Sequence, residues 1–182
     1  MKIRHVLAIL LHASGNSISS KTKIQKEMYF LSQLLNEDFA FRPHYYGPYS
    51  PRVEQALDEL IGAGFLEVKQ KVYGLDYQRG FEMKRFDYSL TPSGEKLAED
   101  LEKKFSNGAS TISLFVKKME DVGNPDYLNL SIAAKVFFIL AKQGGQMKIN
   151  EIEKQASEFD WKINRTDISN AADILKQLGF AN

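Results

Sequence analysis

The sequence predicts a mainly α-helical protein that carries one small β-hairpin. Apolar residues recur every three or four positions through most of the 182 residues, which is the spacing of amphipathic helices. Proline follows a capping residue at Ser50-Pro51, Thr91-Pro92 and Asn124-Pro125, as is typical of helix starts. Between Phe65 and Leu90, apolar residues instead alternate with polar ones, as in half-buried strands.

Two helices are expected in the first 35 residues, over residues 2–13 and 20–35. Each has one apolar stripe that would face the core. Lys21, Lys23 and Lys26 lie in the first turns of the second helix, where the helix dipole favours acidic residues instead. A partner's anion is one explanation for these lysines, and chance is the other.

An unusually aromatic loop follows, from Asn36 to Tyr49. We expect Phe39 and Phe41 to pack back on the core, because free loops rarely carry so many apolar residues. Tyr45 and Tyr46 fit a packed position and a partner surface equally well, since tyrosine is common at binding surfaces.

A third helix is expected from Ser50-Pro51 to Gly62-Ala63-Gly64, with a strand directly after it at Phe65–Val68. A short helix that ends in Gly-Phe-Leu and runs into a strand is typical of the junction between the third helix and the wing of a winged helix. The second strand would cover residues 86–90, and residues 70–85 would form the wing, with or without extra strand pairing. We therefore predict a winged helix-turn-helix domain, with aromatic loop and wing, over residues 1–106.

Residues 107–182 are predicted to form a second, all-helical domain, with the boundary at Ser106-Asn107-Gly108. A helix at 91–105 would precede this boundary. The helices expected after it cover residues 110–122, 124–142, 151–159 and 165–177, and Asn150 with Glu153 resembles a capping box for the third of them.

The two predicted domains share a short internal echo. Ala56-x-Asp58-x-Leu60 with Gly64-Phe65 recurs as Ala171-x-Asp173-x-Leu175 with Gly179-Phe180, at identical spacing. One interpretation is two helix-turn-helix units in tandem, the second truncated before its wing. The other is that helices ending in Leu-Gly-Phe share these residues by chance.

The composition argues against several classes of function. Without cysteine, the chain has no disulfide framework, thiol nucleophile or cysteine zinc site. The three histidines form no metal motif, and no phosphate-binding or dinucleotide-binding glycine pattern is present. We expect no enzyme activity, no cofactor and no small-molecule substrate. No apolar run is long enough to span a membrane, so a cytoplasmic location without membrane contact is the expectation.

Charge is distributed unevenly although the net charge is only +1. Residues 1–52 carry seven Lys/Arg and three Asp/Glu, a net +4, and residues 69–85 carry five and two, a net +3. Between them, residues 53–68 carry four acids and no base, a net −4. The two basic segments would hold the second helix and the wing, where phosphates would lie. A solvated surface of mixed charge is the alternative.

Two segments resemble a known family. The helix Lys23-Ile24-Gln25-Lys26-x-x-Tyr29-Phe30-Leu31 and the loop His44-Tyr45-Tyr46-Gly47-Pro48-Tyr49-Ser50-Pro51 resemble the YwgA-like winged-helix group of bacteria and archaea. More distantly, they resemble the Panacea domain of SocA-like antitoxins. The resemblance covers about residues 1–105. It implies a winged-helix fold and brings no catalytic residue with it.

The first functional hypothesis is a DNA-binding transcriptional regulator. Ser50, Arg52 and Gln55 would then lie nearest the bases. The phosphates would be contacted by Lys21, Lys23 and Lys26 on the second helix and by Arg79, Lys84 and Arg85 on the wing. This hypothesis fails if Glu54, Asp58 and Glu59 line the surface that faces the DNA.

The second hypothesis is a protein-interaction module of antitoxin or adaptor type. The docking surface would be the aromatic loop, through His44, Tyr45, Tyr46 and Tyr49. The regulator ranks slightly ahead, because winged helices most often bind nucleic acid, which is an analogy at the level of the fold. The helices at 93–105 and 110–122 could supply a homodimer interface.

Overall fold

The structure is a computed structural model of the chain that describes residues 1–76 and 81–181, with only the backbone described at 73–76 and 81–84. The described helices are α1 (Ile3–Ala13), α2 (Lys21–Leu34), α3 (Pro51–Gly62), α4 (Pro92–Lys104), α5 (Ser106–Asp121), α6 (Tyr127–Gln143), α7 (Ile149–Glu158) and α8 (Arg165–Leu178). The strands are β1 (Ser17–Ser19), β2 (Leu66–Asp76) and β3 (Phe81–Leu90). The prediction of a mainly helical fold with a small antiparallel sheet is therefore confirmed.

Two of the three predicted helix starts are confirmed. The hydroxyls of Ser50 and Thr91 each accept a backbone N–H from the first turn of their helix, at 3.3 and 3.1 Å. The third is wrong, because Asn124 has a left-handed backbone with φ of 52°. Helix α6 begins instead at Tyr127, and Asp126 is its cap.

Two further boundaries differ from the prediction. Helix α5 begins at Ser106, so Ser106–Gly108 forms its first turn and only Phe105 separates it from α4. Helix α7 begins at Ile149, because the carboxylate that accepts the capping N–H belongs to Glu151, at 2.9 Å from Lys148 N. The division into two domains at residue 106 stays a prediction.

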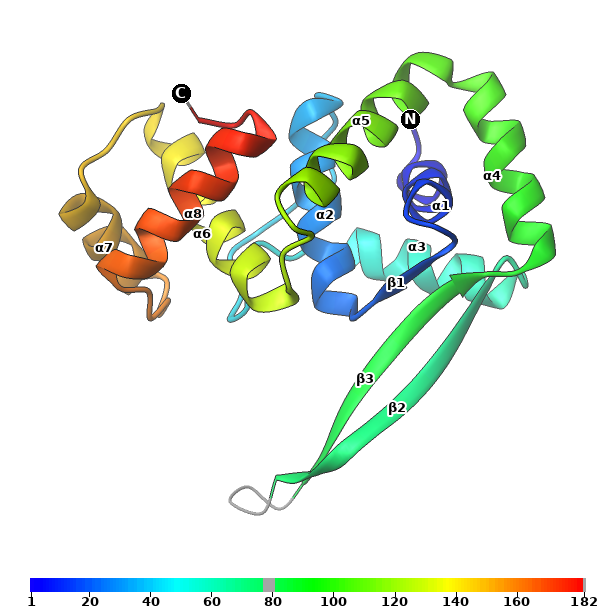
Figure 1. The fold of residues 1–182 in the computed structure, drawn as a ribbon, viewed down its shortest axis with the longest axis horizontal. Coiled ribbons are helices and arrows are strands. Elements are labelled where there is room, and N and C mark those ends of the chain that lie inside the picture. The colour runs from blue at the N-terminus through cyan, green and yellow to red at the C-terminus, as the bar shows by residue number, and fades with distance from the viewer. Residues whose placement is uncertain (77–80, 182) are drawn as a thin grey trace.

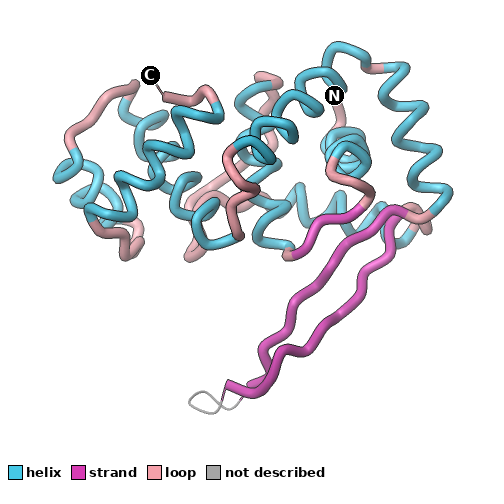
Figure 2. Tube along the Cα trace, viewed as in Figure 1, coloured by secondary structure: helices cyan, strands magenta, loops and turns pink. Residues whose placement is uncertain are grey.

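The sheet has the strand order β1-β3-β2, with both pairs antiparallel. Strand β1 was not predicted, because three residues are too few to show the alternation of apolar and polar side chains that marks a strand. Its central residue, Ile18, is buried opposite Tyr88 of β3. Strands β2 and β3 extend through most of the segment predicted as the wing, so the extra strand pairing that the prediction left open is present. They form an arm that leaves the helical body (Figures 1 and 2).

Two helices are covered from several sides and organise the core. Val6–Leu11 of α1 are all buried, because α3, α4 and α5 pack around that helix. Ile24–Ser32 of α2 are also buried, and α2 contacts both α5 and α6. Helices α6, α7 and α8 pack on one another at the other end of the molecule (Figure 1). None of the described helices is both long and apolar enough to span a membrane.

The echoed residues occupy equivalent places in α3 and α8. The alanine and leucine of each copy are buried, and the aspartate of each copy is exposed. Gly64 and Gly179 both follow their helix with a left-handed backbone, at φ of 75° and 86°. The interpretation as two helix-turn-helix units in tandem stays a prediction.

Helix α4 approaches the α3–β2 junction so closely that its first turn needs glycine. A Cβ atom at Gly94 would lie 2.0 Å from the carbonyl oxygen of Phe65. We expect Gly94→Ala to lower the free energy of unfolding by about 1–3 kcal/mol or more, since this is the usual cost of overpacking. Gly62→Ala is the matched control, because no atom of the described residues outside its own helix turn lies within 4 Å of the Cβ that the change would add. It should raise stability by up to about 1 kcal/mol. Urea denaturation measures both, and equal effects would contradict the close approach.

Candidate functional site

Two buried side chains of α2 hold the end of the aromatic loop. The Gln25 amide donates to the carbonyl of Ser50 at 3.0 Å and accepts from its N–H at 2.9 Å. The Lys26 ammonium donates to the carbonyl of Pro48 at 2.7 Å. Buried backbone groups need such partners. We call Gln25 and Lys26 the clamp, because they fix the loop backbone immediately before α3.

The tip of the loop is held by the opposite end of the molecule. The Trp161 indole donates to the carbonyl of His44 at 2.7 Å. A Cβ atom at Gly47 would lie 3.0 Å from Cγ of Lys135 on α6, and Gly47 has a left-handed φ of 93°. Arg42 and Tyr49 also exchange two backbone hydrogen bonds, at 3.0 and 2.9 Å, which close the turn between them. The loop is therefore restrained by α2, by α6 and by itself.

This rigid loop presents an exposed aromatic pair. The side chains of Tyr45 and Tyr46 are 71% and 49% exposed, and their rings meet edge to face at 4.9 Å. The other two predicted partner residues are more engaged. His44 lies against the ring of Tyr49 at 5.1 Å, and the Tyr49 hydroxyl donates to Glu54. Of the four predicted partner residues, the tyrosine pair is thus the part best placed for contact.

Burial makes the clamp sensitive to protonation. Lys26 is only 2% exposed, and its burial together with the charge of Lys135 lowers the pKa of its ammonium group to about 7. Lys135 is half-buried beside the loop, and burial lowers its pKa as well. The clamp therefore carries a cation that the interior tolerates poorly near neutral pH.

A second buried ionisable group lies one residue further along α2. Glu27 faces a small polar pocket of about 140 Å³, and one of its carboxylate oxygens has no hydrogen-bond partner among the described residues. Burial raises the pKa of Glu27 to about 7, although Lys23 lies 3.9 Å away and opposes this shift. Helical periodicity could not identify this residue, because only the packing of α5 and β1 on α2 encloses it.

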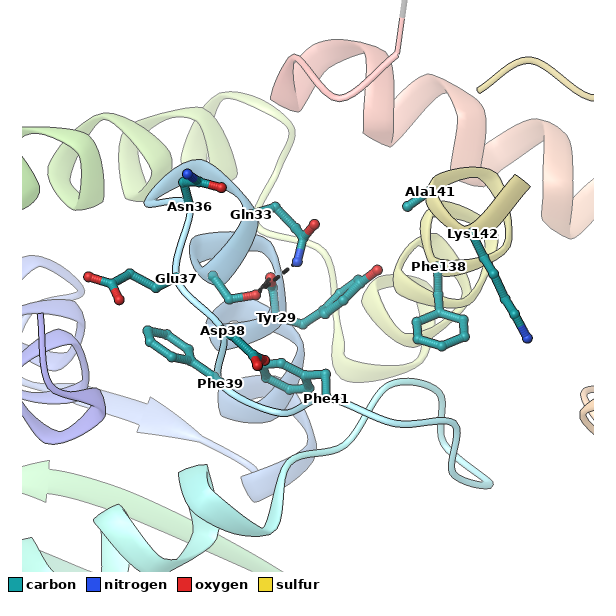
Figure 3. Close-up of a pocket in the computed structure, with 11 residues that line it drawn as sticks. Tyr29, Gln33, Asn36, Glu37, Asp38, Phe39, Phe41, Phe138, Ala141 and Lys142 are labelled. Atoms are coloured by element: carbon teal, nitrogen blue, oxygen red, sulfur yellow. Dashed lines mark hydrogen bonds between the residues drawn. The ribbon is translucent and has the colours of Figure 1, made fainter. Parts of the chain in front are cut away.

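A groove of about 610 Å³ lies between the end of α2, the start of the aromatic loop and the end of α6 (Figure 3). Its aromatic side is formed by Tyr29, Phe41 and Phe138, and its polar rim includes Gln33, Asn36, Glu37, Asp38 and Lys142. The sequence alone does not reveal this groove. Its walls come from segments far apart in the chain, and no local pattern connects them.

Each of the three lysines predicted to contact phosphate has a partner within the chain. Lys21 donates to Glu54 of α3, and Lys23 donates to the side chain of Asn124 at 2.7 Å. Lys26 is buried in the clamp. Ser50 is also fully buried, where its hydroxyl caps α3 and donates to the carbonyl of Phe39. Lys26 and Ser50 are therefore not placed to reach a nucleic acid at the surface.

The exposed face of α3 carries more acid than base. Arg52 and Gln55 are exposed as the DNA hypothesis requires, but Asp58 and Glu59 are exposed on the same helix. Glu54 is half-buried and is bound by Lys21 and Tyr49. One exposed base against two exposed acids gives this helix face a net charge of −1, and Arg4 of α1 pairs with one of the acids, Glu59, at 3.4 Å.

The hairpin has a charged face and an apolar face. Arg85 and Lys71 both pair with Asp87, at 2.8 and 2.9 Å, and Lys69 lies 4.0 Å from Glu67. These residues share one face, because they occupy alternate or opposite positions in the ladder. The other face exposes Val68, Val72 and Phe86. Of the predicted wing contacts, Arg79 lies outside the described residues, as does the side chain of Lys84.

Comparison with known proteins adds no assignment to this geometry. No protein-family model matches the chain, and no curated protein is similar to it. Within the described part of the chain, no three His, Asp or Glu side chains gather closely enough to hold a metal ion. The arrangement offers restrained contact surfaces, a groove lined by aromatic and polar groups, and a small polar pocket at Glu27.

We expect the free energy of unfolding to pass through a minimum near pH 7. Folding lowers the pKa of Lys26 from 10.5 to about 7, so between these values the unfolded chain binds the extra proton and stability rises with pH. Folding raises the pKa of Glu27 from 4.5 to about 7, so between these values the folded chain holds the extra proton and stability falls as pH rises.

Urea denaturation across this pH range separates the two contributions. Lys26→Met should flatten the rise above pH 7, and Glu27→Gln should flatten the fall below it. Lys103→Met is the control, because this side chain is 75% exposed. It should leave both the fall in stability below pH 7 and the rise above it unchanged. If Lys26→Met and Glu27→Gln leave the pH dependence of the free energy of unfolding unchanged, neither group titrates as its burial requires.

Proposed function

We propose that the protein is a non-catalytic recognition module that binds a protein partner through its aromatic loop. The observation that carries this proposal is the exposed Tyr45–Tyr46 pair on a loop restrained from several sides. Tyrosine is enriched among the residues that dominate binding energy at interfaces. A loop that is already ordered loses little conformational entropy on binding, so more of the contact energy appears as affinity.

The charge distribution favours this proposal over DNA binding, whereas the sequence alone ranks the regulator slightly ahead. Affinity for a phosphate backbone comes largely from cations that replace its counterions. Here Lys21 and Lys23 already have polar partners, and Lys26 is buried. Exposed Asp58 would repel phosphate near α3, and the charge of exposed Glu59 is engaged by Arg4. An antitoxin-type or adaptor-type role, as implied by the distant resemblance to the Panacea domain, does not require a basic surface.

A second candidate function is duplex DNA binding by a winged helix. The element order α1-β1-α2-α3-β2-β3 and the strand order β1-β3-β2 support a winged-helix assignment for the first part of the chain. The hairpin would be the wing, and it leaves the body as an arm (Figure 1). Lys69 and Lys71, with side chains 74% and 56% exposed, would then contact phosphates.

The protein-partner proposal is tested at the tyrosine pair. A photoreactive amino acid in place of Tyr45 captures the partner in cells, and the partner is then purified for calorimetry. We expect the Tyr45→Ser, Tyr46→Ser double variant to weaken binding by about 30-fold, which corresponds to the loss of about 2 kcal/mol. Leu114→Ser is the control, because Leu114 is a similarly exposed apolar residue, 56% exposed, on α5. If the double variant and the wild type bind with equal affinity, the loop is not the docking surface.

The DNA-binding candidate is tested by filter binding to random-sequence duplex. Micromolar protein at about 50 mM salt should retain the duplex, because non-specific affinities of DNA-binding proteins are detectable there. Lys69→Glu with Lys71→Glu should abolish retention, whereas the charge-matched change Lys103→Glu with Lys117→Glu on α4 and α5 should not. Absence of binding by the wild type, or equal loss in both variants, would exclude the hairpin as a DNA contact.

A further inference from the structure

Strand β2 forms an open edge of the sheet. The strand order β1-β3-β2 leaves its outer side without a partner strand among the described residues. On β3, the N–H of Leu90 and the carbonyl of Phe86 bond on the side of β1, and backbone groups alternate sides along an antiparallel strand. The register therefore directs the N–H and C=O groups of Val68 and Gln70 away from β3. An edge of this kind is a template for pairing with another strand.

This edge lies where the arm leaves the helical body (Figure 1). The pairing of β2 with β3 is regular from Leu66 to Val72, and a bulge interrupts it between Val72 and Leu75. Just before the strand, Gly62 and Gly64 are exposed, and no more distant described atom lies within 4 Å of a Cβ built on either glycine. The regular part of the edge is therefore open to a second strand.

The charged side chains of β2 are self-complementary in one register. Glu67 and Lys69 are 59% and 74% exposed, and they lie two positions apart on one face of the strand. When two copies of β2 run antiparallel with Val68 opposite Val68, Glu67 of each copy faces Lys69 of the other. The adjacent registers centre on Glu67 or on Lys69 and place like charges opposite each other, which is destabilising. Lys71, the next base, is already paired with Asp87 at 2.9 Å.

The other face of the arm gains apolar contact in the same register. Val68 is 41% exposed, and its cross-strand neighbour Tyr88 is buried in the core. Pairing about Val68 brings the two valines together and continues the row from Tyr88 into the second copy. Val72 and Phe86 lie on the same face and are 53% and 37% exposed, so the apolar surface of the arm extends beyond the row.

We propose that the protein forms a homodimer in which the β2 edges of two copies pair antiparallel about Val68. The pairing joins the two three-stranded sheets into one. The backbone groups of Val68 exchange hydrogen bonds with those of the second copy, and two Glu67–Lys69 ion pairs fix the register. This interface lies on the arm, away from the helices at 93–105 and 110–122 that the sequence offers as a homodimer surface.

Cysteine cross-linking tests the register, because the chain has no cysteine of its own. Directly opposite residues that exchange hydrogen bonds have Cα atoms about 5.5 Å apart, within reach of a disulfide. Val68→Cys should therefore give a covalent dimer on oxidation with copper phenanthroline. Val72→Cys is the matched control, since it is an exposed valine of the same strand face whose two copies would lie about 26 Å apart. Equal yields from both variants, or a monomeric Val68→Cys, would overturn the proposal.

Sedimentation equilibrium of the full chain tests the charge pairs. Glu67→Lys and Lys69→Glu should each raise the dissociation constant of the dimer about 10-fold, because like charges then face each other twice. An equimolar mixture of the two variants should recover the affinity of the wild type, since each lysine again faces a glutamate. A mixture that associates no better than either variant alone would contradict the register.

Lys103→Glu is the control for net charge, because Lys103 is a 75% exposed base on α4 and its reversal changes the net charge as much as Lys69→Glu does. It should leave the dissociation constant unchanged. Equal weakening by both variants would show that net charge or a helical surface governs association, which would overturn the proposal. A wild type that stays monomeric throughout the micromolar range would overturn it as well and leave the edge to a strand of a different protein.

Discussion

The hydrogen bonds from Gln25 and Lys26 to the loop backbone are the constraint on which the rest of the structure depends. They place the carbonyl of Pro48 and both backbone groups of Ser50 against α2. Ser50 then caps α3, so one residue joins the clamp to the next helix. Burying an ammonium group costs several kcal/mol unless it is well bonded. The interior accepts Lys26 because it satisfies a backbone group that would otherwise be unpaired.

The same constraint explains how a loop so rich in aromatic residues can stay ordered outside regular secondary structure. Its inner residues, Phe39 and Phe41, pack toward the core, as the sequence predicts. Its tip is carried across to α6, where Gly47 and the Trp161 indole anchor it. The loop therefore joins the helices around α1 to the C-terminal helices. It forms part of the groove on one side and displays the tyrosine pair at its tip.

The distribution of charge along the sequence does not predict the charge of the folded surface. The basic segment at residues 1–52 was expected to lie where phosphates would bind, yet its Lys21 donates to Glu54 of the acidic segment that follows. On the hairpin, Lys71 and Arg85 converge on Asp87, whose pKa they lower by hydrogen bonding and charge. Opposite charges brought together in this way neutralise one another locally. Cations that are already paired are less able to bind phosphate. The analogy with DNA-binding proteins is therefore weaker for the predicted contact residues than for the fold as a whole.

By itself, the sequence determined the helical class, most helix boundaries, the caps at Ser50 and Thr91 and the hairpin, because these follow from spacing and local chemistry. It could not show β1, which has three residues and becomes a strand only by pairing with β3. The roles of Lys26, Glu27 and Tyr29 were decided by tertiary structure, because each depends on what covers α2. The same holds for the groove, whose rings come from α2, the aromatic loop and α6. Periodicity reports which face of a helix is apolar, whereas burial of a polar group depends on contacts between distant segments.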